Sequence, residues 1–294
     1  MTARAPLRSV SRDVKGGTMR RARTKRTIRI WATIVCSTLL ATAALSALSV
    51  AVASGATAWT ASTAPLGGLT TGVYANPGVT FGKVVPGATS DPEACPSTSW
   101  CVAVGSYNDA SGHLQGLIET WSAGSWTSQT APLTNLSPLA ASDPMVTLTG
   151  LSCPSATSCV AVGSYSGTRQ DALIETLTGQ TWTSSNAPLT GLNPDTIPDS
   201  MLLGLSCATS SSCVAVGQYQ DITNAYQGLI ETLSNGSWSP SEAPIGGLNP
   251  VAVLPPTVLL TSLSCPSISS CVAVGFYDAA TGVQGLIETL ANGV

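Results

Sequence analysis

The sequence predicts an all-β fold made of four copies of one unit, and three observations support this prediction. A cysteine, five residues and then Cys-Val-Ala-Val-Gly-x-Tyr recur at Cys95, Cys153, Cys207 and Cys265, with spacings of 58, 54 and 58 residues. Each copy continues into Leu-Ile-Glu-Thr. Both segments are short, rich in β-branched residues and bounded by turn formers, which is typical of strands. No helix is predicted after residue 53.

Each unit is expected to contain four antiparallel strands. The first strand leads into the first cysteine, as in Leu148–Cys153, and the Val-Ala-Val-Gly and Leu-Ile-Glu-Thr segments form the second and third. The fourth follows a glycine turn and contains a tryptophan, as in Asn235-Gly236-Ser237-Trp238, where Asn-Gly favours a hairpin. The units are therefore predicted near 59–120, 126–176, 182–232 and 238–289, within one domain that spans 54–294.

The tryptophan strands suggest how the units are joined. They lie at Trp59, Trp126, Trp182 and Trp238, so a tryptophan strand precedes the first complete unit and none follows the last. We expect the Trp59 strand to complete the final sheet. Because β-propellers close in this way around four-stranded blades, the predicted architecture is a four-bladed β-propeller. A fragment of a larger propeller and an open β-solenoid are the alternatives.

The repeat resembles the blades of secreted bacterial β-propeller proteins of the kelch and Asp-box kind. Turns such as Gly124-Ser125-Trp126 resemble the end of an Asp-box, and the repeated Cys-Val-Ala-Val-Gly-x-Tyr resembles a group of exported bacterial repeat proteins. The resemblance covers Trp59–Val294. It implies propeller architecture rather than an activity.

Eight cysteines form four pairs with five residues between partners. An even number in this arrangement indicates disulfides, and the repetition favours pairing within each unit. Zinc binding is the alternative, but the spacing is wider than usual and no histidine accompanies the pairs, so no metal and no cofactor are expected. The predicted pairs are Cys95–Cys101, Cys153–Cys159, Cys207–Cys213 and Cys265–Cys271.

The first 53 residues have the layout of a secretory signal. Ten Lys and Arg residues lie within the first 30 positions, and an uncharged stretch runs from Ile30 to Ala53. Cleavage after Ala53 would release a secreted or cell-envelope protein. An uncleaved membrane anchor is the alternative, since about 20 apolar residues can span a bilayer.

The body of the chain is acidic. From Ser54 onward there are 14 Asp and Glu residues, against the two cations Lys83 and Arg169. Two cations cannot supply the phosphate contacts that nucleic-acid binding requires, so nucleic acid is excluded as a partner. An extracellular protein or glycan remains possible, whereas the oligomeric state is left open.

The repeated carboxylates are interpreted as structural, because residues copied into every unit usually hold the unit together. These are Glu119, Glu175, Glu231 and Glu288. Without cationic partners they should accept hydrogen bonds from backbone or hydroxyl groups or lie at a solvated edge, and partial burial should raise their pKa values. His113, the only histidine, is interpreted as a solvated loop residue, and no catalytic triad is supported.

Positions where the repetition fails are the candidate ligand-binding residues. Trp100 and Trp121 do not recur, Arg169 is one of only two cations in the body, and Tyr74 lies in an unusually long first connection. The predicted function is an exported, non-catalytic scaffold that binds a protein, cell-wall polymer or glycan through its rim loops. The alternative is an exported hydrolase or lyase that acts on polysaccharide through non-repeated acids, namely Asp91, Glu93, Asp109 or Asp143.

Overall fold

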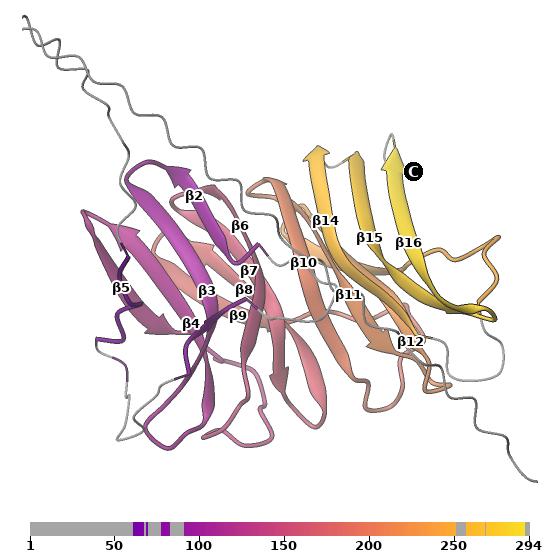
Figure 1. Cartoon of the computed structure of the whole chain (residues 1–294), viewed down its shortest axis with the longest axis horizontal. Coiled ribbons are helices and arrows are strands. Elements are labelled where there is room, and N and C mark those ends of the chain that lie inside the picture. The colour runs from indigo at the N-terminus through magenta and orange to yellow at the C-terminus, as the bar shows by residue number, and fades with distance from the viewer. Residues whose placement is uncertain are drawn as a thin grey trace, which may run out of the picture. The chain divides into compact units, whose positions relative to one another are not determined.

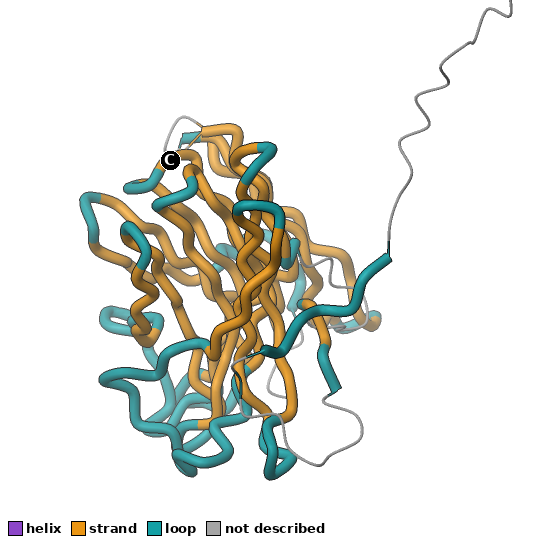
Figure 2. The backbone as a smooth tube through the Cα atoms, turned by 90° about the vertical axis from the view of Figure 1, so that its left-hand side faces the viewer, coloured by secondary structure: helices purple, strands orange, loops and turns teal. Residues whose placement is uncertain are grey.

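In the computed structural model, the described residues form sixteen strands, which make up four antiparallel sheets of three to five strands (Figure 1). The structure describes residues 61–67, 69, 78–82, 91–250, 257–267 and 269–291. Within these ranges every regular element is a strand (Figure 2), and no helix there is long and apolar enough to cross a membrane. The all-β prediction is therefore confirmed. The predicted signal segment, Trp59 and Tyr74 lie outside the described residues.

The sheets are numbered here from first to fourth in chain order. The first sheet consists of β1 (Thr80–Phe81), β2 (Glu93–Ser97), β3 (Trp100–Asn108), β4 (Leu114–Ser122) and β5 (Ser125–Thr130). The second consists of β6 (Thr147–Ser155), β7 (Ser158–Ser166), β8 (Gln170–Thr178) and β9 (Thr181–Asn186). The third consists of β10 (Ser200–Thr209), β11 (Ser212–Gln220), β12 (Tyr226–Ser234) and β13 (Ser237–Glu242). The fourth consists of β14 (Val258–Ser267), β15 (Ser270–Ala279) and β16 (Gly282–Ala291).

Each sheet is a meander in which the Val-Ala-Val-Gly strand is central and pairs with a strand on either side. In the third sheet, Cys207 lies opposite Cys213 across the β10–β11 hairpin, and their Cα atoms are 3.9 Å apart. The same local disulfide closes the other three hairpins, with Cα separations of 4.1, 4.1 and 4.2 Å. The predicted pairing is confirmed. Four disulfide bonds are consistent with an extracellular or exported protein.

Consecutive sheets pack face to face, and the strand period of two decides which residues meet. We call the face that bears the two valines of Val-Ala-Val and the isoleucine of Leu-Ile-Glu-Thr the leading face; it packs on the next sheet in the chain. The opposite, trailing face bears the cysteine, alanine, leucine and tryptophan, and it packs on the preceding sheet. Between the second and third sheets, for example, Val162 and Ile174 contact the region of Ala215 and Leu229. Three hydrophobic cores of this kind join the four sheets.

The repeated tryptophans and glycines serve this packing. Trp182 and Trp238 pack in the cores that precede their own sheets, so they lie between consecutive sheets. Gly217 follows the Val-Ala-Val segment, and a Cβ there would collide with the carbonyl oxygen of Met201 on β10. Gly163 and Gly275 have the same close backbone approach. Their recurrence is therefore a consequence of strand packing.

The first and fourth sheets depart from the four-stranded pattern. In the first sheet two short strands, β1 and β2, both pair with β3, where the other sheets have one longer strand. Phe81 of β1 pairs with Gly105, in the register that Leu148 has with Gly163 in the second sheet. The fourth sheet has three strands within the described residues. The predicted completing strand at Trp59 falls outside them, so ring closure by that strand remains a prediction.

Candidate functional site

The turn between β3 and β4 of the first sheet is built around Asp109. Its Oδ1 accepts hydrogen bonds from the backbone N–H groups of Ser111 (2.8 Å) and His113 (3.0 Å), and its Oδ2 accepts one from Gln115 Nε2 (3.2 Å). Burial acts to raise the pKa of Asp109, but the hydrogen bonds from His113, Ser111 and Gln115 outweigh it and lower the pKa below its ordinary value. Asp109 is therefore held ionised as a loop-organising group.

The third sheet repeats this turn around Asp221. Asp221 Oδ1 accepts hydrogen bonds from the backbone N–H groups of Thr223 (2.8 Å) and Ala225 (3.0 Å), and Oδ2 accepts one from Gln227 Nε2 (2.8 Å). Burial again opposes a lowered pKa of Asp221, and the hydrogen bonds again prevail. Ala225 is thus the structural counterpart of His113, because each donates its backbone N–H to the organising aspartate.

His113 borders a polar cavity of about 370 Å³ at this end of the first sheet. Its Nδ1 is 3.7 Å from Asp109 Oδ2. Tyr107 Oη and Thr130 Oγ1 are hydrogen-bonded at 2.7 Å, and Gln115 Nε2 also donates to the carbonyl oxygen of Ser142 at 3.1 Å. The lining residues are Tyr107, Asp109, Ser111, His113, Gln115, Thr130, Ala141 and Ser142. Hydrogen bonds thus hold the side chains of Tyr107, Asp109, Gln115 and Thr130 in place around the cavity.

Arg169 lies in the corresponding turn of the second sheet, but its charge is already paired. Its Nη1 donates to Gln220 Oε1 at 2.9 Å and lies 3.5 Å from Asp199 Oδ2. Tyr226 Oη donates to the same Asp199 oxygen at 3.1 Å. Arg169 therefore links the turn of the second sheet to residues of the third, and its guanidinium is half-exposed.

The two non-repeated tryptophans lie in different environments. Trp100 is half-buried and packs against the core between the first and second sheets. Trp121 lies on the trailing face of the first sheet, where its ring and that of Trp126 form a tilted pair with centroids 5.7 Å apart. The structure thus brings neither Trp100 nor Trp121 into the lining of the His113 cavity.

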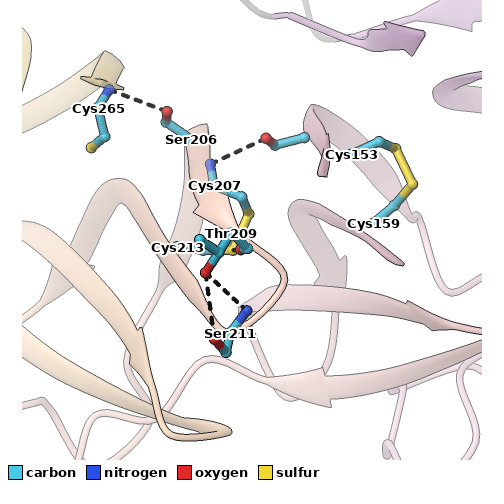
Figure 3. Close-up of a disulfide and its surroundings, with 9 residues drawn as sticks. Cys153, Cys159, Ser206, Cys207, Thr209, Ser211, Cys213 and Cys265 are labelled. Atoms are coloured by element: carbon cyan, nitrogen blue, oxygen red, sulfur yellow. Dashed lines mark hydrogen bonds between the residues drawn. A yellow bond between two sulfur atoms is a disulfide. The ribbon is translucent and has the colours of Figure 1, made fainter. Parts of the chain in front are cut away.

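A second polar cavity, of about 410 Å³, is bordered by β2, β6, β10 and β14, one strand from each sheet. We call these four the inner strands. Asp91 and Glu93 line it from the first sheet, and Ser152, Ser206 and Ser264 line it from the others. Ser152 Oγ accepts a hydrogen bond from the backbone N–H of Cys207, and Ser206 Oγ accepts one from the backbone N–H of Cys265, both at 3.1 Å (Figure 3).

Asp109 and Asp143, the other two predicted acids, do not line this second cavity. Asp143 Oδ1 accepts a hydrogen bond from the backbone N–H of Leu114 at 3.2 Å. The four candidate acids therefore fall into two groups.

The repeated glutamates lie on the trailing faces of their sheets, where Glu119, Glu175 and Glu231 are buried. Neither carboxyl oxygen of Glu119, Glu175 or Glu231 has a hydrogen-bond partner in the described structure, which corrects the expectation of backbone or hydroxyl donors. Burial raises the pKa of Glu119 to about 7, of Glu231 to about 8 and of Glu175 to about 9, and it also raises the pKa of Glu288. Burial therefore favours the protonated form of these side chains, because ionising them away from water is unfavourable. Their buried positions support the structural interpretation.

No metal centre is apparent in the described ranges, which contain no cluster of three or more His, Cys, Asp or Glu side chains able to hold an ion. The functional feature that sequence reasoning missed is the aspartate-centred turn. Its signal was present in Asp109-x-Ser-x-His113-x-Gln115 and in Asp221-x-Thr-x-Ala225-x-Gln227. An aspartate that binds backbone groups two to four residues ahead is a recognised turn device, and the shared spacing with Gln is visible only when the two units are aligned.

Comparison with known proteins finds similarity to solved structures alone. No family model matches the chain, and no curated protein matches it. Among solved structures, the chain is similar to a mutant of AofleA from Arthrobotrys oligospora, with 12% identity and a TM-score of 0.36. The alignment covers 66% of this chain and 52% of that one, so the chain spans about half the length of that protein. The resemblance to kelch and Asp-box repeats remains a prediction.

Proposed function

We propose that the four sheets are blades of a β-propeller and that the protein is an exported, non-catalytic scaffold whose rim binds a neutral glycan. The observation that carries this proposal is the preorganised polar cavity at His113. Propeller architecture is supported by three successive interfaces of the same construction and by inner strands of all four sheets that border one cavity.

The chemistry of the His113 cavity suits a polyhydroxylated ligand. Sugar hydroxyl groups both donate and accept hydrogen bonds, and the cavity offers a carboxylate, an imidazole, an amide and several hydroxyls. Tyr107 adds an aromatic ring to the lining. A ligand with negative charge would meet Asp109 and an acidic chain, so a neutral glycan is favoured over a phosphate or a carboxylate.

The role of Asp109 supports binding rather than catalysis. A general acid needs a pKa near the working pH, whereas hydrogen bonds hold the pKa of Asp109 below its ordinary value. Its two oxygens are also occupied by loop groups. Asp109 therefore shapes the cavity, while His113 and Gln115 are free to present their remaining polar atoms to a ligand.

A glycan array identifies the ligand, and isothermal titration with the best-bound oligosaccharide tests the site. His113→Ala should weaken binding at least about tenfold, which corresponds to about 1.4 kcal/mol. The variant should fold normally, because Ala225 already occupies the equivalent place in the third sheet. Val283→Ala, at an exposed position of the fourth sheet, is the matched control and should bind as the wild type does. The proposal fails if no glycan binds, or if His113→Ala retains full affinity.

One observation favours the enzymatic alternative. Asp91 and Glu93 border the same 410 Å³ cavity, and paired acids are what polysaccharide hydrolysis requires. If this pair is catalytic, purified protein should release reducing sugars from a polysaccharide, and Asp91→Asn and Glu93→Gln should each abolish the release. Asp195→Asn, in another part of the chain, should leave it unchanged. Release that persists in both site variants would exclude this pair.

A further inference from the structure

The three internal interfaces between sheets share one construction. Between the third and fourth sheets, Val214 and Val216 of the leading face contact the region of Cys271 and Ala273 on the trailing face. The same residue types meet in the two earlier interfaces. A leading face and a trailing face are therefore complementary surfaces that the chain uses three times.

In the described part of the chain, the leading face of the fourth sheet has no sheet packed on it. Val272 is 46% exposed, Val274 41% and Ile287 71%, whereas Val162 and Ile174, their counterparts in the second sheet, are fully buried. The face also has room for a neighbour at Gly285. A Cβ placed there would meet no atom within 4 Å, while one at Gly116 would meet Ala131 and Val146 at 2.7 Å. The fourth sheet thus displays an apolar half-interface around Val272, Val274 and Ile287.

The trailing face of the first sheet is the other unpaired half. A cavity of about 380 Å³ opens on it, and the lining includes Cys101, Ala103, Glu119 and Trp126. The first three correspond to Cys271, Ala273 and Glu288 of the fourth sheet, which face Val214 and Val216 across a smaller space of about 260 Å³. The cavity is therefore located where the valines of a preceding sheet would fit.

A short segment on the first sheet strengthens this correspondence. Ser128 Oγ donates to the carbonyl oxygen of Gly67 at 3.2 Å, just as Ser184 Oγ of the second sheet donates to Thr134 at 3.0 Å. Thr134 belongs to the Ala131-Pro132-Leu133-Thr134 connection that leaves the first sheet. Ala64-Pro65-Leu66-Gly67 thus lies on the first sheet as the connection of a preceding sheet would.

That correspondence identifies specific atoms for the missing contact. Ala131 and Ala243 donate their backbone N–H groups to the carbonyl oxygens of Gly116 (2.9 Å) and Gly228 (2.8 Å). By the same pattern, the backbone N–H of Ala64 would donate to the carbonyl oxygen of Gly285 if the leading face of a fourth sheet packed there. Likewise Ser264 is exposed, although its counterparts Ser152 and Ser206 each accept the backbone N–H of a cysteine in the next sheet. The cysteine that would follow Ser264 in this series is Cys95, which is also exposed.

In the part of the chain that the structure describes, the two halves do not pack on one another, because the hydrophobic cores join only consecutive sheets and none joins the fourth to the first. A second copy can supply the missing neighbour of each half while the three packed interfaces keep their arrangement. We propose that the leading face of the fourth sheet binds the trailing face of the first sheet of a second copy, so that copies join head to tail into a closed ring.

Native mass spectrometry of the purified, oxidised protein tests the proposal directly. The expected mass is that of two copies, or of a larger closed ring. Ile287→Asp blocks the leading half and Ala103→Arg fills the cavity of the trailing half, so each variant alone should lose the assembly. Mixed together, the two variants should recover a one-to-one dimer, because each still has one intact half. Ile222→Asp, on an exposed turn of the third sheet, is the control and should assemble as the wild type does.

The outcomes separate the proposal from its rivals. A wild-type protein that is monomeric at every concentration overturns the proposal, whether the chain closes on itself or not, and this result does not depend on any variant folding. An assembly that survives both substitutions also overturns it, because some other surface must then hold the copies together. The assembly does not depend on the glycan proposed above, and His113→Ala should leave the mass unchanged.

Discussion

The backbone N–H of Cys265 donates a hydrogen bond to Ser206 Oγ at 3.1 Å, which ties the disulfide hairpin of the fourth sheet to the inner strand of the third. Cys207 and Ser152 make the same contact one sheet earlier. Each serine therefore links two consecutive sheets at their inner edge, next to the hydrophobic core.

Removing the serine hydroxyl should weaken the link between sheets. Ser206→Ala leaves the N–H of Cys265 without its acceptor, and a lost hydrogen bond of this kind costs about 1 kcal/mol. Denaturation in urea should show a lower midpoint with an unchanged slope. Ser210→Ala, in the exposed disulfide loop of the same sheet, is the matched control and should leave the midpoint unchanged. An unchanged midpoint in Ser206→Ala would show that the contact contributes nothing to stability.

The local disulfides should each make a modest contribution. Cys207 and Cys213 are separated by six positions, so their bridge closes a small ring that removes about 2 kcal/mol of chain entropy from the unfolded state. Replacing both cysteines with serine should lower the free energy of unfolding by about that amount without abolishing folding. Peptide mapping of the wild type under non-reducing conditions should recover all four local bridges. A bridge between two different hairpins would contradict the pairing.

Stability should fall as the pH rises from about 4.5 to about 9. The folded carboxyls of Glu175 and Glu231 have pKa values raised to about 9 and about 8 by burial, whereas the unfolded groups ionise near 4.5. Between these values the folded state retains protons that the unfolded state has released, so folding is weakened as the pH increases. The contribution is complete below about pH 4.5 and is lost as the pH rises through the folded pKa values.

Chemical denaturation at a series of pH values between about 5 and about 9 measures this effect. Glu175→Gln retains the shape of the side chain but cannot ionise, so its stability should depend less on pH than that of the wild type. Glu93→Gln removes an exposed carboxyl and should leave the pH profile unchanged. A melting temperature that drops steadily from pH 7 to pH 4.5 would contradict the prediction.

The glycine after Val-Ala-Val should tolerate no side chain. In Gly217→Ala the new methyl group would collide with the carbonyl oxygen of Met201, which is held in the adjacent strand. The two strands must move apart to relieve this collision, so the free energy of unfolding should fall by more than about 2 kcal/mol, in the range of severe core mutations. Gly246→Ala is a suitable control, because a Cβ there meets nothing within 4 Å. Equal melting temperatures for the two variants would show that the strands can adjust.

The repeated parts of the fold could be predicted because four similar segments in one chain indicate the same strand pattern four times. The Val-Ala-Val-Gly strand, its hairpin disulfide and its glycine appear four times, and each copy imposes the same local geometry. The short strand β1 could not be predicted, because Thr80–Phe81 is too short to show a strand pattern and only its pairing with β3 identifies it. Long-range pairing of this kind leaves no local signal.

The candidate site was harder to predict than the fold. His113 was expected to be a solvated loop residue, and the cavity beside it depends on Ser142 and Thr130, which come from other parts of the unit. Arg169 was predicted to bind a ligand, which remains a prediction, and nothing in the sequence indicated its contacts with Asp199 and Gln220. The missing hydrogen bonds of the buried glutamates were also unexpected, because a sequence shows which residue types recur and not how closely the sheets enclose them.

The six-residue separation between bridged cysteines also bears on how the chain matures. If the chain is exported as we propose, partners so close in sequence would emerge together during translocation across a membrane, and each bridge could be oxidised before the rest of the chain has appeared. Wrong pairs would have to join cysteines from hairpins that emerge at different times. We therefore expect the native bridges to form in the order of synthesis, with little need for an isomerase to reshuffle them.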